Sequence, residues 1–477
     1  MIRRRHSARC LALATTLVVV ALPGAAAQTL DRSRPPASAP AAPYTFPKVQ
    51  TRTLPNGLRL ILIEDHALPL VAVRAVVGVD SLNDPVGKEG LYVLTTGMLR
   101  EGTTSMTAEQ LSSASSALGN VVLPLRFTTI SQNFERSLAL MADMLAHPAF
   151  PQPALDRLKA TLAATQQRFL QAAATVPNKI FLVQLFGSDH PLARATSALD
   201  ASTASITRDE LQHFHETFFR PNNTTLIVVG DVREQDAVAA VASSFGSWER
   251  GSVPKASVPP TRTPPPTTIY LLDRPGVAQT NVVVGTLGPP RSSPDFAALE
   301  VMAPILGASG GSRLYQNLRE RHGYMYSGTP AAVVWRREPM PSVIYGSAVV
   351  NAEKTDSALI EWLGELRGIR QRPPTYQEMM LARGSLTDAL PVQMETDDLV
   401  ANRVLSMVQN GVPLDFYNSY GTRIAAVTPA AVSAAAARYL DLGHLVIVVA
   451  GDRKVIEAGL RAANIGPIVI VNESGKP

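Results

Sequence analysis

An internal repeat is the feature that most constrains how this chain can fold. Residues 206–232 (ITRDELQHFHETFFRPNNTTLIVVGDV) and 427–453 (VTPAAVSAAAARYLDLGHLVIVVAGDR) align without a gap, at an offset of 221 residues. The matched positions include Thr207/Thr428, Phe218/Tyr439, Val228/Val449, Gly230/Gly451 and Asp231/Asp452. A match of this length indicates a gene duplication, so the sequence predicts two α+β halves of about 200 residues each.

Each copy of the repeat predicts a helix, a short connection and a buried strand. Thr207 and Glu210 form a capping box at the start of the first helix, and Thr428 followed by Pro429 gives the second helix an N-cap and a proline at its first position. The apolar runs LIVV and VIVVA then end in Gly-Asp, which is typical of a short strand followed by a turn.

Proline-rich segments divide the rest of the chain. Residues 251–268 (GSVPKASVPPTRTPPPTT) predict a linker between an N-terminal half, 49–250, and a C-terminal half, 269–477. Residues 28–48 are rich in proline and alanine and predict a flexible leader. Residues 153–173 predict a long helix with one apolar face.

The first 27 residues predict a secretory signal peptide. Four arginines precede a short apolar run, and Ala25-Ala26-Ala27 is a small-residue cleavage site. Its removal would leave 40 Lys and Arg against 39 Asp and Glu, and no cysteine. We therefore expect a periplasmic protein that has no membrane span after signal cleavage. Nothing in its charge favours nucleic acid.

Several segments together resemble the M16 (insulinase/pitrilysin-like) metallopeptidases. The resemblance covers nearly all of the chain after the signal, and the segments that carry it are LPNGLRLIL, GLYVLTTGMLREGT (90–103), FFRPNNTTLIVVGDV, LLDRPGVAQ and GSRLYQNLRERHGYMYSG. It implies an α+β fold of the LuxS/MPP-like class. In that fold, two homologous tandem halves, each a sheet packed with helices, face each other as a clamshell.

The same resemblance implies that the metal site has been lost. Active members carry H-x-x-E-H on a helix, where two histidines bind Zn²⁺ and the glutamate polarises water. Here the frame around the motif is kept, but the histidines fall on Val93 and Gly97, and the glutamate falls on Thr96. The spacing to the last ligand leads to about Ala174. None of these side chains can ligate zinc, so the sequence predicts no metal and no cofactor in this chain.

Another pair of histidines gives no alternative zinc site. His213 and His215 are followed by Glu216 in a predicted helix. Side chains two residues apart on a helix point in nearly opposite directions, so a structural role is the better interpretation.

Arg319 and Tyr326 are the candidate substrate-binding residues. They lie seven residues apart in NLRERHGYMYSG. In two-part M16 enzymes the half without zinc often supplies an arginine and a tyrosine in this frame. A guanidinium can donate to a peptide carbonyl, and a phenol can donate to an oxyanion. On the residues alone, both could equally be a solvated arginine and a packed tyrosine.

Two hypotheses about function follow. The first is a zinc-free pseudoenzyme subunit of a periplasmic M16-type peptidase heterodimer, inactive alone. It would complete the cleavage chamber, contact a peptide or unfolded protein substrate, and rely on a partner subunit that carries H-x-x-E-H and the zinc. The second is a non-enzymatic scaffold or a peptide-binding homodimer of the same fold. An active zinc peptidase is disfavoured by the missing ligands.

Overall fold

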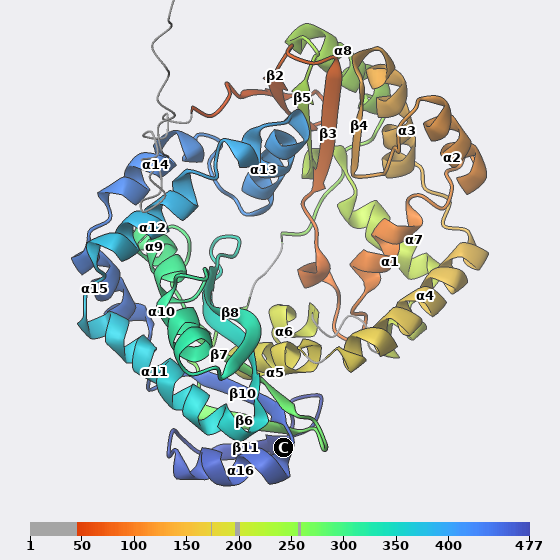
Figure 1. The fold of residues 1–477 in the computed structure, drawn as a ribbon. Helices are drawn as coiled ribbons and strands as arrows, with labels where there is room; N and C mark the ends of the chain where they lie inside the picture. The colour runs from red at the N-terminus through yellow and green to blue at the C-terminus, as the bar shows by residue number, and fades with distance from the viewer. Residues whose placement is uncertain (1–44, 173, 196–200, 256–258) are drawn as a thin grey trace, which may run out of the picture. The chain divides into compact units, whose positions relative to one another are not determined.

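The fold combines two β-sheets with many helices. A computed structural model describes residues 45–172, 174–195, 201–255 and 259–477. The expected signal peptide and most of the expected leader therefore lie outside the described residues. Everything from Pro43 onward forms a single compact unit. The expected α+β class is confirmed, because each half of the chain contributes one sheet packed with helices (Figure 1).

Strands from the first half build a five-stranded sheet in the order β1-β2-β5-β3-β4. Neighbouring strands run antiparallel except for the parallel pair β2 and β5. The strands are β1 Gln50–Thr53, β2 Arg59–Glu64, β3 Leu70–Val77, β4 Arg126–Ile130 and β5 Thr224–Gly230.

Strands from the second half build a six-stranded sheet in the order β11-β6-β10-β7-β9-β8. The repeat strand β10 pairs parallel with β6 and antiparallel with β7, just as β5 pairs with β2 and β3. The duplication read from the sequence is therefore also present in the strand pairing. The strands are β6 Thr268–Asp273, β7 Gln279–Leu287, β8 Met325–Val334, β9 Val343–Asn351, β10 Val446–Gly451 and β11 Ile468–Val471.

Helices cover both sheets. In the first half they are α1 Leu91–Met98, α2 Ala108–Ala117, α3 Phe134–Ala146, α4 Gln152–Gln171, α5 Thr175–Phe186, α6 Pro191–Ala195, α7 Arg208–Phe218 and α8 Glu234–Phe245. In the second half they are α9 Phe296–Leu306, α10 Arg313–Tyr315, α11 Thr355–Gln371, α12 Tyr376–Thr387, α13 Asp397–Gln409, α14 Phe416–Ala426, α15 Pro429–Tyr439 and α16 Arg453–Ala462. The predicted caps of α7 and α15 are present: Thr207 and Glu210 form the capping box, and Thr428 caps α15.

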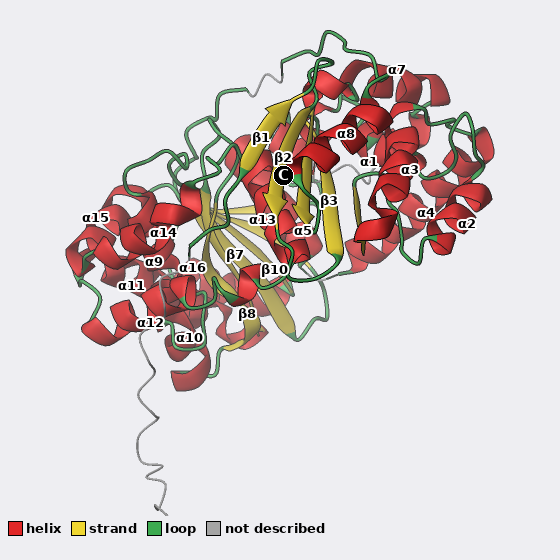
Figure 2. Ribbon diagram, turned by 90° about the horizontal axis from the view of Figure 1, so that it is seen from above, coloured by secondary structure: helices red, strands yellow, loops and turns green. Residues whose placement is uncertain are grey.

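Two equivalent helices are exchanged between the halves. Helix α5 of the first half packs on strands β7 and β10 of the second sheet, where Phe181 and Val448 belong to one buried cluster. Helix α13 of the second half packs on β3 and β5 of the first sheet, where Val404 and Ile227 share a cluster. The two helices are repeat equivalents, since Thr175 and Thr396 lie 221 residues apart. In Figure 1, α13 lies beside β3 of the first sheet and α5 lies beside β10 of the second, and Figure 2 gives the view from above.

A buried arginine fixes the position of α13. Arg74 of β3 is only 3% exposed, and it forms an ion pair with Asp398 at the start of α13. Arg74 Nε also donates to Asn402 Oδ1 at 2.8 Å, and the Thr128 hydroxyl donates to Asp398 at 2.8 Å. Asn402 Nδ2 donates to the other carboxylate oxygen at 3.0 Å. A buried guanidinium is stable only with such partners, so this cluster holds the two halves in one register.

The two acids at the start of α13 are in opposite electrostatic situations. Burial raises the pKa of Asp397 to about 6, and the nearby charge of Asp65 acts in the same direction. Burial also acts on Asp398, but hydrogen bonds from Arg74 and Thr128 outweigh it and lower the pKa of Asp398. Asp397 therefore opposes folding at neutral pH, whereas Asp398 favours it.

We expect Asp397→Asn and Asp398→Asn to change the stability in opposite directions. The Asp397 variant should be more stable than the parent at pH 7.5. Its gain should fade as the pH drops from 6 towards 4, where the parent carboxyl is protonated in the folded state. The Asp398 variant should lose about 1–3 kcal/mol at pH 7.5, because Arg74 is left without its anion. Its loss should shrink in acid. Thermal melts at pH 7.5 and at pH 4 test this. If both variants raise, or both lower, the stability at pH 7.5, the prediction is wrong.

Candidate functional site

Helix α1 occupies the place of the family's metal-binding helix, and its first turn is firmly held. The Asp84 carboxylate accepts hydrogen bonds from the backbone N–H groups of Gly90 at 2.9 Å and Tyr92 at 2.8 Å. Burial raises the pKa of Asp84 to about 6, although these two donors favour its charged form. Glu89, which precedes the N-cap residue Gly90, forms an ion pair of 2.8 Å with Arg194. These contacts within the chain fix the first turn of the helix.

The three motif positions on α1 cannot hold zinc. The Val93 side chain is apolar and 36% exposed. The Thr96 hydroxyl donates to the backbone carbonyls of Tyr92 at 2.9 Å and Val93 at 3.1 Å, so its hydrogen bond is already used within the helix. At Gly97 a Cβ atom would lie 2.8 Å from Leu158 Cδ2 of α4. Helix α1 therefore packs closely against α4 at Gly97, and a histidine there would require Leu158 to move.

The remaining candidate ligands do not fit a metal either. Ala174 is the exposed N-cap residue of α5 and carries no donor atom in its side chain. Among the described residues, no three His, Cys, Asp or Glu side chains are grouped closely enough to bind a metal ion.

His213 and His215 lie on different faces of α7, as their spacing predicts. His213 is exposed, whereas His215 is buried, stacks on Phe219 at 4.9 Å and contacts the backbone oxygen of Leu145 at 2.8 Å. Burial lowers the pKa of His215 to about 4, so its imidazole is neutral near pH 7. The structural interpretation of this pair is the one the geometry supports.

The structure brings Arg319 and Tyr326 together. Arg319 lies in a π-helical turn, Gln316–Arg321, and Tyr326 is the second residue of the edge strand β8. Arg319 Nη1 donates to the backbone carbonyl of Tyr326, and the guanidinium lies over the Tyr315 ring at 5.6 Å. The Tyr326 side chain is 68% exposed, and its hydroxyl has no hydrogen-bond partner among the described residues. Both side chains can therefore reach another molecule.

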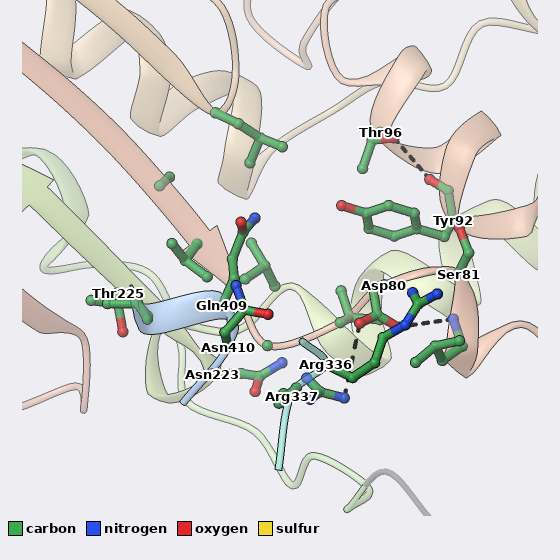
Figure 3. Close-up of a pocket in the computed structure, with 18 of the residues that line it drawn as sticks. Asp80, Ser81, Tyr92, Thr96, Asn223, Thr225, Arg336, Arg337, Gln409 and Asn410 are labelled. Atoms are coloured by element: carbon green, nitrogen blue, oxygen red, sulfur yellow. Dashed lines mark hydrogen bonds and ion pairs between the residues drawn. The ribbon is translucent and has the colours of Figure 1, made fainter. Parts of the chain in front are cut away.

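A pocket of about 630 Å³ lies where the two halves meet. One wall comes from the end of β3 and from Tyr92 and Thr96 of α1; the other comes from the β8–β9 loop, 335–342, and the end of α13. Figure 3 shows Tyr92 and Thr96 of α1 together with Arg336, Gln409 and Asn410 around this pocket. Arg319 and Tyr326 do not line it.

The pocket contains functional side chains that sequence reasoning missed. Arg336 has no hydrogen bond or ion pair to any described residue, and its Nε atom is buried. Arg337, by contrast, lies 3.9 Å from Asp80. The adjacent Trp-Arg-Arg between two apolar strands was a visible signal, but the sequence alone does not show which of the two arginines is paired.

The fold is that of a peptidase-like protein, and the motif positions Val93, Thr96 and Gly97 carry no zinc-ligating side chains. Comparison with known proteins agrees with this class. Residues 205–386 match the family model described as the peptidase M16 inactive domain. A curated relative, an uncharacterized zinc protease of Mycobacterium leprae, is 25% identical over 366 residues, which cover 74% of this chain and 80% of the relative.

Solved structures show the same fold. The peptidase M16 inactive domain from Pseudomonas fluorescens superimposes with a TM-score of 0.75 at 24% identity, covering 84% of this chain and 98% of that chain. The first half of the periplasmic protease PqqL from Escherichia coli gives a TM-score of 0.70 at 16% identity, covering 88% of this chain and 97% of that chain. In fold and in the match of residues 205–386, the chain is similar to the M16 peptidases, and its α1 positions do not spell H-x-x-E-H.

No helix among the described residues combines the length and the apolar character needed to cross a bilayer.

We expect that restoring the motif residues does not restore the metal site. The triple variant Val93→His/Thr96→Glu/Gly97→His should bind zinc far more weakly than native sites. The reason is that the side chain at position 97 meets Leu158 at 2.8 Å and position 174 supplies no carboxylate. Adding Leu158→Ala and Ala174→Glu should raise the zinc affinity at least about tenfold. Titration calorimetry with zinc tests this. Stoichiometric, tight binding by the triple variant would show that the steric argument is wrong.

Proposed function

We propose that this chain is the zinc-free subunit of a periplasmic M16-type peptidase heterodimer. The observation that carries the proposal is a contrast between two sites in one chain. Helix α1 keeps the frame of the motif and the Asp84 contacts at its first turn but carries no metal-ligating side chain at the motif positions, whereas Arg319 and Tyr326 lie close together and are exposed. A chain that keeps candidate substrate-binding residues but no metal ligands suits a subunit that binds a substrate while its partner cleaves it.

The chemistry of this subunit would be positioning and charge stabilisation. The zinc of the partner subunit would activate the water that attacks the peptide. The Arg319 guanidinium can donate to a backbone carbonyl of the substrate. Its hydrogen bond to the Tyr326 carbonyl already restricts the side chain, so less conformational entropy is lost when substrate binds. The free Tyr326 phenol can donate to the oxyanion that forms at the attacked peptide bond.

The size and the start of the chain support this proposal. Nearly the whole length of the first half of PqqL is matched by this one chain. The fold of this chain thus corresponds to one half of such a protease, and in the proposal a second M16-like chain completes the chamber. The predicted signal peptide, residues 1–27, favours the periplasm as the place where the two subunits meet.

A second candidate function is a scaffold or a peptide-binding homodimer without any catalytic partner. The pocket of about 630 Å³ between the halves favours it, since its apolar and polar lining offers a peptide a binding site apart from any cleavage chemistry. Affinity purification of the tagged chain from its native periplasm, with mass spectrometry of what co-elutes, separates the two. A near-equimolar partner with H-x-x-E-H supports the heterodimer, and recovery of the chain alone supports the alternative.

We expect Arg319→Ala and Tyr326→Phe to lower the turnover of the reconstituted complex. Each should reduce kcat by roughly 10- to 100-fold, because each removes a donor used in the transition state. The matched control is Arg321→Ala, since Arg321 lies in the same π-helical turn and is exposed. Steady-state kinetics on an unfolded protein substrate provide the measurement. Unchanged kcat in both variants would count against the proposed roles.

A further inference from the structure

The loop between β8 and β9 is held in place on both sides of Arg336. The Trp335 indole nitrogen donates to Glu300, and Arg337 lies 3.9 Å from Asp80 of the first half. Met340 is 5% exposed and belongs to the buried cluster around α5. The backbone that carries Arg336 is therefore fixed by its neighbours, although Arg336 itself contributes no bond to that arrangement.

Arg336 carries a charge that the described residues do not neutralise. Its guanidinium makes no hydrogen bond or ion pair with them, and Nε is shielded from solvent. Burial lowers the pKa of Arg336, and the Tyr345 phenol acts in the opposite direction. An arginine nevertheless stays protonated in proteins and offers five N–H donors in a planar fork. The guanidinium is half-buried with only Nε fully shielded, so its terminal N–H groups can donate to an anion that enters the pocket, and such an anion would offset the cost of the partial burial.

Other groups in the pocket point to the kind of anion. The Tyr92 phenol has no hydrogen-bond partner among the described residues, and burial raises its pKa, so it stays a neutral donor. Asp80 also lines the pocket, and Arg337 partly offsets its negative charge. The charge that remains would repel a doubly charged phosphate more strongly than a singly charged carboxylate. A single carboxylate matches one unpaired guanidinium and one phenol.

The rest of the lining indicates what the carboxylate is attached to. Apolar side chains cover much of the wall, among them Leu82, Leu125, Leu182, Leu192 and Val408. The amide side chain of Gln409 stands at the pocket without a hydrogen-bond partner among the described residues, and it can pair with a peptide group. The volume, about 630 Å³, is in the range of pockets that enclose a ligand.

We propose that this pocket binds the carboxylate of an apolar peptide segment, with Arg336 and Tyr92 as the donors and Gln409 reading the peptide backbone. The inference rests on the proposed function, in that both place a peptide against this chain, but it concerns a different site from Arg319 and Tyr326. The pocket includes Tyr92 and Thr96 of the helix that has lost its metal ligands. The space beside that helix thus serves recognition instead of hydrolysis.

The carboxylate has two possible sources, the free C-terminus of a peptide or an Asp or Glu side chain. Three fluorescent six-residue peptides separate them: one ending in two leucines with a free carboxylate, its C-amidated counterpart, and an amidated peptide with a glutamate before the last leucine. Fluorescence anisotropy with the purified chain gives each Kd. We expect one or both carboxylate peptides to bind at least tenfold more tightly than the uncharged one. Equal affinities, or no binding, would overturn the inference.

The decisive variant is Arg336→Gln. It should remove the tenfold advantage of the carboxylate peptides while leaving the weak binding of the uncharged peptide unchanged. Without peptide, its melting temperature should equal or exceed that of the parent, because Arg336 has no partner to lose. Arg100→Gln is the control, since the Arg100 side chain is 62% exposed and does not line the pocket. A lower melting temperature for Arg336→Gln, with the carboxylate advantage retained, would mean that Arg336 is structural.

The two proposals can fail separately. If the carboxylate advantage is absent but Arg319→Ala still lowers the turnover of the complex, the pocket inference is wrong and the proposed function stands. If the advantage depends on Arg336 but no zinc-bearing subunit co-purifies, the pocket inference stands and the heterodimer is wrong.

Discussion

The exchange of α5 and α13 between the two sheets is the constraint on which the rest of the structure depends. Each sheet needs a helix on its inner face to bury apolar side chains, and here that helix comes from the other half. The halves therefore cannot separate without exposing both inner faces to water, at a cost that grows with the apolar area. The ion pair of Arg74 with Asp398 fixes the position of α13 on the first sheet, because a buried guanidinium accepts few alternative positions.

This rigid connection explains how a site can persist after its chemistry is lost. Helix α1 is held by the Asp84 carboxylate and packs on α4 through the bare Gly97 position, so contacts within the chain position it. The frame that the family uses to place a metal is retained here as a wall of the pocket between the halves.

The arginines near the contact between the two halves are of two kinds: those paired with a carboxylate of the chain and those without such a pair. Arg74 and Arg337 have carboxylates close by, whereas Arg336 has none. Unsatisfied buried charge usually lowers stability, and proteins retain it where function requires it. The Tyr326 hydroxyl is similar, since it is exposed on the edge strand β8 and has no hydrogen-bond partner among the described residues. The proposed functions assign an external ligand to each of these unsatisfied groups.

The sequence by itself determined what depends on local patterns: the duplicated helix–strand unit, the caps at Thr207 and Thr428, and the loss of donor atoms at Val93, Thr96 and Gly97. It also placed Arg319 near Tyr326, because a turn and a strand keep residues seven apart close. Only the tertiary structure decided which sheet α5 and α13 cover and which arginine lacks an anion. Periodicity reports that a helix has a buried face, but the partner of that face, or of a charge, lies hundreds of residues away and is fixed by packing.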